Sequence, residues 1–240
     1  MSSPAVSKEQ KKDKKFLLIV LAASCLVAAM FGSRNSLSLT IEGIDQSQTL
    51  NYLQISFAFA LGQLVVGAIS PFAGMIADKY GSGKTLTVGI LLGLLGIILI
   101  PYSTTAFTLS ISLGVISSIG LGVAGLPVVL ASVNRLIPQS KVGMAFGLVN
   151  AGQSLGQLIL APLAGFIIVN FGWILCILFL CTVLLLVLPF SFTLRSRTDT
   201  KQPSSVQTKS LSETLRIAFN TPSYISVSYT HLRAHETGWY

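Results

Sequence analysis

The sequence predicts an all-α membrane protein with six transmembrane helices, and three observations support this fold class. Of its 240 residues, 52% are hydrophobic and only 10% are charged, whereas soluble domains carry about 25% charged residues. Several apolar stretches exceed the roughly 18 residues that a helix needs to cross a bilayer. These stretches are continuous and do not alternate with polar residues, which favours helices over the strands of a β-barrel.

The predicted elements follow one another with short polar connections. Residues 1–15 form a polar tail with five lysines, and the bundle of spans covers residues 16–194. Residues 195–226 are polar and basic, which is typical of a flexible connector at the membrane surface. The six spans are predicted at about residues 16–40, 53–77, 85–102, 107–134, 144–169 and 173–194.

The basic residues predict the orientation of the bundle. Fourteen of the 16 Lys and Arg residues lie in the tail, in the connections after spans 2 and 4, and in residues 195–226 after span 6. The connections after spans 1, 3 and 5 carry none. Because cytoplasmic loops are enriched in Lys and Arg, we expect both ends of the bundle in the cytoplasm. We therefore predict a multi-pass protein of a bacterial inner membrane or a plasma membrane, with the lipid bilayer as its first partner.

Composition also argues against several other classes of protein. A net charge of +8 on a soluble domain would suggest nucleic acid, but here the basic residues lie at the ends of spans, so no nucleic-acid partner is expected. The three cysteines lie in apolar stretches, and both histidines lie after residue 230. Without a cluster of ligands or paired carboxylates, we expect no metal, no cofactor and no enzymatic activity.

A short charged segment rich in glycine lies between the second and third apolar stretches. Gly74, Asp78, Lys79 and Gly81 follow the pattern Gly-x-x-x-Asp-(Arg/Lys)-x-Gly, and Lys84 adds a further basic residue. We expect a turn here, because such a charged segment cannot lie in hydrocarbon. The segment resembles the loop between the second and third transmembrane helices of major facilitator superfamily transporters.

The resemblance implies a conformational role for this loop. In the family, the acidic residue bridges the two halves of the transporter and helps to hold the outward-open state, which assigns that role to Asp78. Its carboxylate could accept hydrogen bonds from Arg135 at the end of span 4, or it could face the N-terminus of a helix in the second half. Ser82 and Gly83 stand where the family usually carries basic residues, so the basic part of the loop is shorter here.

Six helices with both ends inside, followed by a polar connector, match one half of the superfamily's twelve-helix plan. The resemblance covers about residues 14–220. It implies a secondary active transporter of a small solute that works by alternating access, with a coupling ion in symport or antiport, and a C-terminal half as partner. Residues 227–237 look like a translated sequencing adapter. We therefore expect 227–240 to be a non-native tail and this half to be inactive alone.

Polar side chains inside the spans are the candidates for a substrate pathway. Arg34 is the only charged residue deep in a predicted span, and its guanidinium suits a carboxylate. Asn150, Gln153 and Gln157 are spaced so that they share one face of span 5. The alternatives are that the three amides bond only to neighbouring helices, and that Arg34 extends its side chain to the outer interface.

Several weaker likenesses bear on the substrate. The region around Arg34, the glycines of span 4 and the run from Gly152 to Gln157 look like monocarboxylate and oxalate/formate porters. This likeness implies an organic anion, such as a monocarboxylate, as the substrate. The segment from Ala161 to Gly165 loosely resembles an antiporter motif, so a drug/proton antiporter is an alternative. A six-helix channel or scaffold, complete as it stands, is another.

Overall fold

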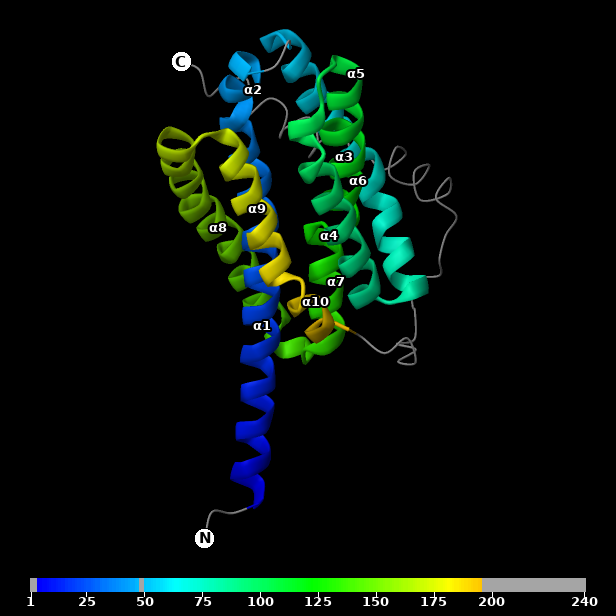
Figure 1. The fold of residues 1–240 in the computed structure, drawn as a ribbon. Coiled ribbons are helices and arrows are strands. Elements are labelled where there is room, and N and C mark those ends of the chain that lie inside the picture. The colour runs from blue at the N-terminus through cyan, green and yellow to red at the C-terminus, as the bar shows by residue number, and fades with distance from the viewer. Residues whose placement is uncertain (1–3, 48–49, 196–240) are drawn as a thin grey trace, which may run out of the picture. The chain divides into compact units, whose positions relative to one another are not determined.

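A computed structural model describes residues 4–47 and 50–195 of the chain. The predicted connector, apart from its first residue, and the predicted non-native tail therefore lie outside the described residues. The described part consists of helices joined by short turns (Figure 1). In chain order they are α1 (Pro4–Leu37), η1 (Ser38–Thr40), α2 (Ile41–Ser47), α3 (Tyr52–Tyr80), α4 (Ser82–Ile98), η2 (Ile100–Tyr102), α5 (Ala106–Leu109), η3 (Ser110–Ser117), α6 (Ser118–Val123), α7 (Leu126–Leu136), η4 (Gln139–Lys141), α8 (Val142–Phe171), α9 (Trp173–Val187) and α10 (Phe190–Thr193).

Six helical stretches in the described part are long and apolar enough to cross a membrane, which confirms the predicted fold class. Each coincides with one of the six predicted spans, and their ends differ from the predicted ones mostly by a few residues. The stretches are Asp13–Asp45, Tyr52–Tyr80, Ser82–Tyr102, Ala106–Leu136, Gln139–Phe171 and Trp173–Thr193.

The glycine-rich segment is more helical than the sequence suggested. Helix α3 continues through Asp78 and Lys79 to Tyr80, and α4 begins at Ser82. Only Gly81 interrupts the helices. Its φ of 90° is a conformation that side chains disfavour, and its N–H still bonds to the carbonyl oxygen of Ala77. The expected turn is therefore a single residue, and the charged side chains stand on helical turns beside it.

The fourth span is divided into shorter helices. It begins with α5, passes through the π-helical segment η3 and continues into α6, which ends before an interruption at residues 124–125. Gly125 is extended there, with φ −63° and ψ 169°, and α7 begins with Leu126 and Pro127. Because proline is favoured in the first helical turn, Pro127 suits the start of α7. The sequence predicted one helix across this region, at about residues 107–134.

The helices pack as two groups within the described bundle. Helix α1 lies along α8 and α9, and α3 and α4 lie against η3 and α6. Glycine permits the closest approaches. A Cβ atom on Gly156 of α8 would lie 2.2 Å from the carbonyl oxygen of Ala28 in α1, and one on Gly120 of α6 would lie 2.1 Å from the backbone nitrogen of Gly93 in α4. Small residues at such crossings let the backbones of neighbouring helices approach closely.

Helices α3 and α8 are the most exposed spans of the described part. Only 17% of the most apolar stretch of each is buried, compared with 67% for the span that contains α6. Spans 3 and 6 contain long runs of leucine and isoleucine, which would favour lipid as their main partner. Yet half of the most apolar stretch of the third span is buried, because the glycines of this span pack against α6. The faces without partners in this bundle thus belong to α3 and α8.

Candidate functional site

Arg34 lies in the last turn of α1 and reaches toward the neighbouring helix α3. Its guanidinium Nη2 donates a hydrogen bond to the amide oxygen Oε1 of Gln63. The arginine is half-buried, and no carboxylate forms an ion pair with it in the part of the chain that the structure describes. A neutral amide therefore solvates the cation without cancelling its charge.

Two cavities meet at this pair. The larger has a volume of about 210 Å³, and the smaller about 140 Å³. Arg34, Gln63 and Leu121 line both cavities, so they separate one from the other. The remaining lining of the larger cavity includes Asn35, Ser38, Phe59, Ser117 and Ser118, and that of the smaller includes Met30, Phe31, Val66, Ser70 and Pro127.

Serine hydroxyls from the fourth span face the larger cavity. Ser118 donates to the carbonyl oxygen of Leu113 five residues earlier, at 3.1 Å, which is the spacing of a π-helix. Ser117 is 1% exposed and also lines the larger cavity. Gly62 of α3 makes room for this turn, because a Cβ atom there would lie 2.5 Å from Ser118 Oγ. The larger cavity is therefore lined by serine residues of the fourth span as well as by Arg34.

The three amides predicted on span 5 lie elsewhere. Asn150, Gln153 and Gln157 stand on α8 and line neither of these two cavities. Asn150 is exposed and donates to the carbonyl oxygen of Phe146 in its own helix, at 2.9 Å. Arg34 therefore lines two cavities together with residues of α3 and α6, and the three amides of α8 line neither of them.

Gln63 is the residue that the sequence did not indicate. Gln54 lies nine residues earlier in the same span, which places it on another side of the helix. The structure separates their roles, because Gln54 caps the start of α3 by accepting a hydrogen bond from the backbone N–H of Asn51 at 3.1 Å. One signal was available, since an amide in the middle of a span rarely faces lipid.

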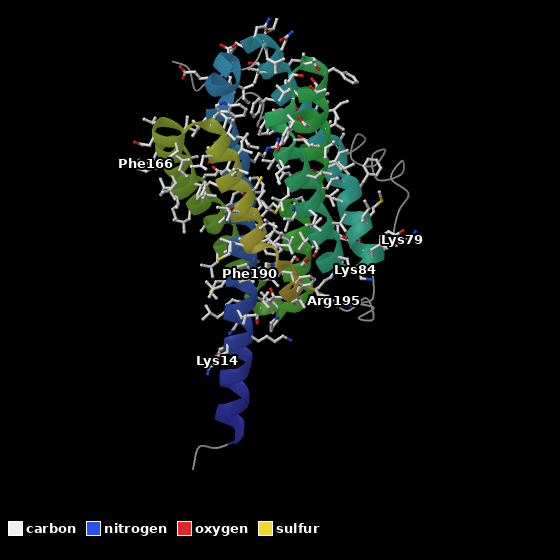
Figure 2. All side chains as sticks on the ribbon, viewed as in Figure 1. Lys14, Lys79, Lys84, Phe166, Phe190 and Arg195 are labelled. Carbon is white, nitrogen blue, oxygen red and sulfur yellow. The ribbon has the colours of Figure 1, made fainter. Side chains whose placement is uncertain are left out.

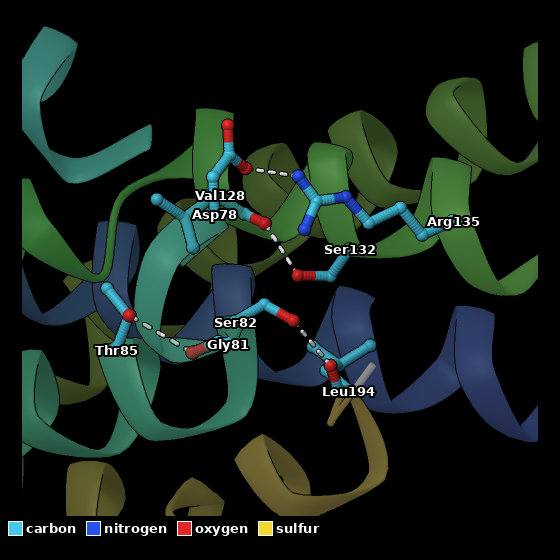
Figure 3. A network of polar contacts seen from close by, with 8 residues as sticks. All are labelled: Asp78, Gly81, Ser82, Thr85, Val128, Ser132, Arg135 and Leu194. Carbon is cyan, nitrogen blue, oxygen red and sulfur yellow. Dashed lines mark hydrogen bonds and ion pairs between the residues drawn. The ribbon is translucent and has the colours of Figure 1, made fainter. Parts of the chain in front are cut away.

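A second arginine forms an ion pair at the end of α3. Arg135, in the last turn of α7, donates to the carboxylate of Asp78 in the last turn of α3 (Figure 3). Their side chains are 35% and 60% exposed. Nearby, the hydroxyl of Ser82 donates to the carbonyl oxygen of Leu194 at 2.9 Å, which holds the end of the described chain against the start of α4.

The other residues of the glycine-rich segment are placed around this pair. The Lys79 ammonium lies 5.2 Å from the centre of the Tyr80 ring, and Lys84 is exposed. A Cβ atom on Gly74 would meet nothing within 4 Å, so no contact in the described bundle requires a glycine there. Lys79 and Lys84 lie toward one end of the bundle, whereas Phe166 lies toward the other (Figure 2).

The described residues hold no group of three or more His, Cys, Asp or Glu side chains that could bind a metal ion. They form a bundle of six helical stretches that could cross a membrane, and the half-buried Arg34 lies between two cavities. Fold and site together define an integral, multi-pass membrane protein. The family model of the Major Facilitator Superfamily matches residues 20–232, and the chain belongs to this superfamily.

Curated relatives of this chain are transporters. The riboflavin transporter RibZ of Clostridioides difficile is 27% identical over 162 residues, covering 68% of this chain and 35% of that protein. Human monocarboxylate transporter 2 is 26% identical over 156 residues, covering 65% of this chain and 32% of that protein. The chain thus spans about a third of the length of the curated relatives it matches.

A solved structure shows the same fold. The xylose transporter XylE from E. coli, in an inward-open conformation, matches with a TM-score of 0.63 at 16% identity. The match covers 74% of this chain and 48% of that one. The described bundle therefore has the fold of one half of a major facilitator protein.

Proposed function

We propose that the full-length gene product is a secondary transporter of a small organic anion, and that Arg34 binds the anion. The observation that carries this proposal is the environment of Arg34, which has a neutral hydrogen-bond partner, no ion-pair partner among the described residues, and a cavity on either side. A charged side chain at mid-membrane costs about 2.5–3.5 kcal/mol on insertion scales. An anionic substrate would offset part of that cost.

The size of the site supports a small substrate. The larger cavity, at about 210 Å³, holds roughly seven water volumes of about 30 Å³ each. Pockets for drug-sized ligands are commonly about 300–1,000 Å³. A short carboxylate fits this space. The monocarboxylate transporters among the relatives agree with this class, and the riboflavin transporter shows that related chains carry other solutes.

Transport by alternating access needs a second six-helix half, and we propose that it packs against α3 and α8. These two spans are the least buried in the described bundle. Asn150 is exposed on α8, and Gln153 and Gln157 are half-buried there. Since exposed amides are disfavoured in lipid, they suit either an interface with a second half or a water-filled pathway between the halves.

We further propose that the Asp78–Arg135 pair and the rest of the glycine-rich segment lie at the cytoplasmic face and act on the conformational equilibrium. The grouping of Lys79 and Lys84 at one end supports this orientation. Cysteines introduced at Asp45 and Lys84, in a background free of native cysteines, should then react with impermeant reagents from opposite sides of the membrane. Reaction of both from one side would contradict the orientation.

The transport proposal is tested by uptake of labelled solutes into cells or vesicles that contain the full-length gene product. We expect uptake of one or more short carboxylates, inhibited by other carboxylates and not by neutral sugars. The 240-residue chain alone is the matched control and should give none. Uptake of cationic drugs in exchange for protons would favour the antiporter alternative. Passive flux through the 240-residue chain alone would favour a channel.

A further inference from the structure

We infer that Gln63 is an internal substitute for the anion at Arg34, and that it sets how strongly an anion must bind to enter the site. This inference rests on the proposed function of Arg34. The amide oxygen of Gln63 accepts the hydrogen bond that a carboxylate oxygen would otherwise accept. A glutamine offers one such oxygen and no charge, so it occupies the guanidinium without neutralising it.

The geometry allows the amide to be displaced. Gln63 is an exposed side chain on α3, and both cavities reach it. An anion in either cavity can therefore approach the guanidinium beside the amide. Arginine and a carboxylate frequently form two parallel hydrogen bonds between opposite charges, whereas the amide oxygen of Gln63 accepts a hydrogen bond without a charge of its own. A carboxylate should accordingly replace the amide oxygen, whereas a neutral solute gains nothing by doing so.

Competition of this kind lowers the apparent affinity for every anion. The bound state has lost the Arg34–Gln63 hydrogen bond, so the measured affinity is the difference between the two contacts. Leucine at position 63 would keep a side chain of similar size and remove the competitor. Glutamate there would place a permanent carboxylate on Arg34 and fill the anion position. The two substitutions should thus have opposite effects on anion binding.

The test uses the purified full-length gene product in detergent, with sodium acetate as the probe and its stabilisation of the folded state as the readout. A ligand that binds the folded state raises the unfolding midpoint as its concentration exceeds Kd. Gln63→Leu should tighten acetate binding by about tenfold, which corresponds to about 1.4 kcal/mol. Gln63→Glu should abolish the response at neutral pH. Gln54→Leu, the same change on the same helix, should leave the acetate affinity unaltered.

The outcomes separate this inference from the proposed function. If the native chain binds acetate and Gln63→Leu binds it equally or more weakly, Gln63 is not a competitor. If Gln63→Leu does not fold, retained acetate binding in Gln63→Glu overturns the inference. If neither the native chain nor any variant responds to acetate, whereas Arg34→Gln and Gln63→Leu still show coupled effects on unfolding, the anion site itself is wrong and Gln63 serves only to solvate Arg34.

Discussion

Arg34 and Arg135 are each bound by a side chain of α3, yet their partners differ in charge. Arg135 has the carboxylate of Asp78, at an exposed helix end. Arg34 has the amide of Gln63, beside two cavities within a span. The partner of an arginine therefore decides whether its guanidinium is available to an anionic ligand. The charge of Arg135 is neutralised by a carboxylate, whereas the charge of Arg34 is not neutralised by its amide partner.

Helix α3 contributes both Gln63 and Asp78, the partners of the two arginines, so a movement of α3 would affect both regions. Gln63 and Asp78 are fifteen residues apart, or about 22 Å along an ideal helix. Pro71 lies between them, and proline inside a helix removes a hydrogen bond and permits bending. A movement of α3 against α1 and α7 would therefore change both contacts. This arrangement gives a physical route by which substrate at Arg34 could affect the pair at Asp78.

The largest expected effect comes from removing the charge of Arg34. Losing one partner of a charged, desolvated contact typically costs about 2–5 kcal/mol, so Arg34→Gln should reduce anion uptake by the full-length product by a factor of about thirty or more. Arg34→Lys keeps the charge but loses the bidentate fork, and should reduce it less. Initial rates of uptake over a range of concentrations measure both. Normal uptake with normal expression in both variants would show that Arg34 does not bind the substrate.

A smaller effect is expected from Asp78→Asn. Both members of its ion pair are substantially exposed, and exposed pairs contribute about 0.2–1 kcal/mol. Within this half, the unfolding midpoint should therefore change little. Accessibility labelling from both sides should shift toward the cytoplasm by at most about fivefold if Arg135 is the sole partner.

The matched control for that variant is the double exchange Asp78→Arg with Arg135→Asp, which keeps the pair and reverses it. A shift well beyond fivefold in Asp78→Asn, not repaired by the exchange, would show that Asp78 has a second partner outside the described bundle. No shift at all would remove the conformational role proposed for Asp78.

The smallest effect is expected at the second ion pair of the described bundle. Lys141 Nζ lies 2.7 Å from the carboxylate of Asp13 and 5.1 Å from the centre of the Phe16 ring. The side chains are 43% and 62% exposed, so Asp13→Asn should cost less than about 1 kcal/mol. Thermal unfolding measures this change, and uptake should be unaffected. A shift in accessibility labelling as large as that of Asp78→Asn would mean that both ion pairs act alike.

The sequence predicted the spans well because hydrocarbon imposes a strict length and polarity on each of them. It also indicated Arg34, since a charge in an apolar stretch is conspicuous, and it pointed to Arg135 as a neighbour of Asp78. It did not indicate Gln63, because the pairing of α1 with α3 depends on how distant spans pack. The π-helical segment that contains Ser117 has no sequence pattern that distinguishes it from an α-helix. It lies where glycines bring neighbouring helices close together.

The most direct test of the difference between the two arginines is equilibrium binding of a labelled carboxylate, one that the full-length product transports, to Arg34→Gln and Arg135→Gln. Both substitutions remove one guanidinium and create the same amide. We predict that Arg34→Gln lowers the affinity for the carboxylate by at least tenfold, whereas Arg135→Gln keeps the native affinity for a given conformational state. Equal losses in both variants, or a loss confined to Arg135→Gln, would contradict it.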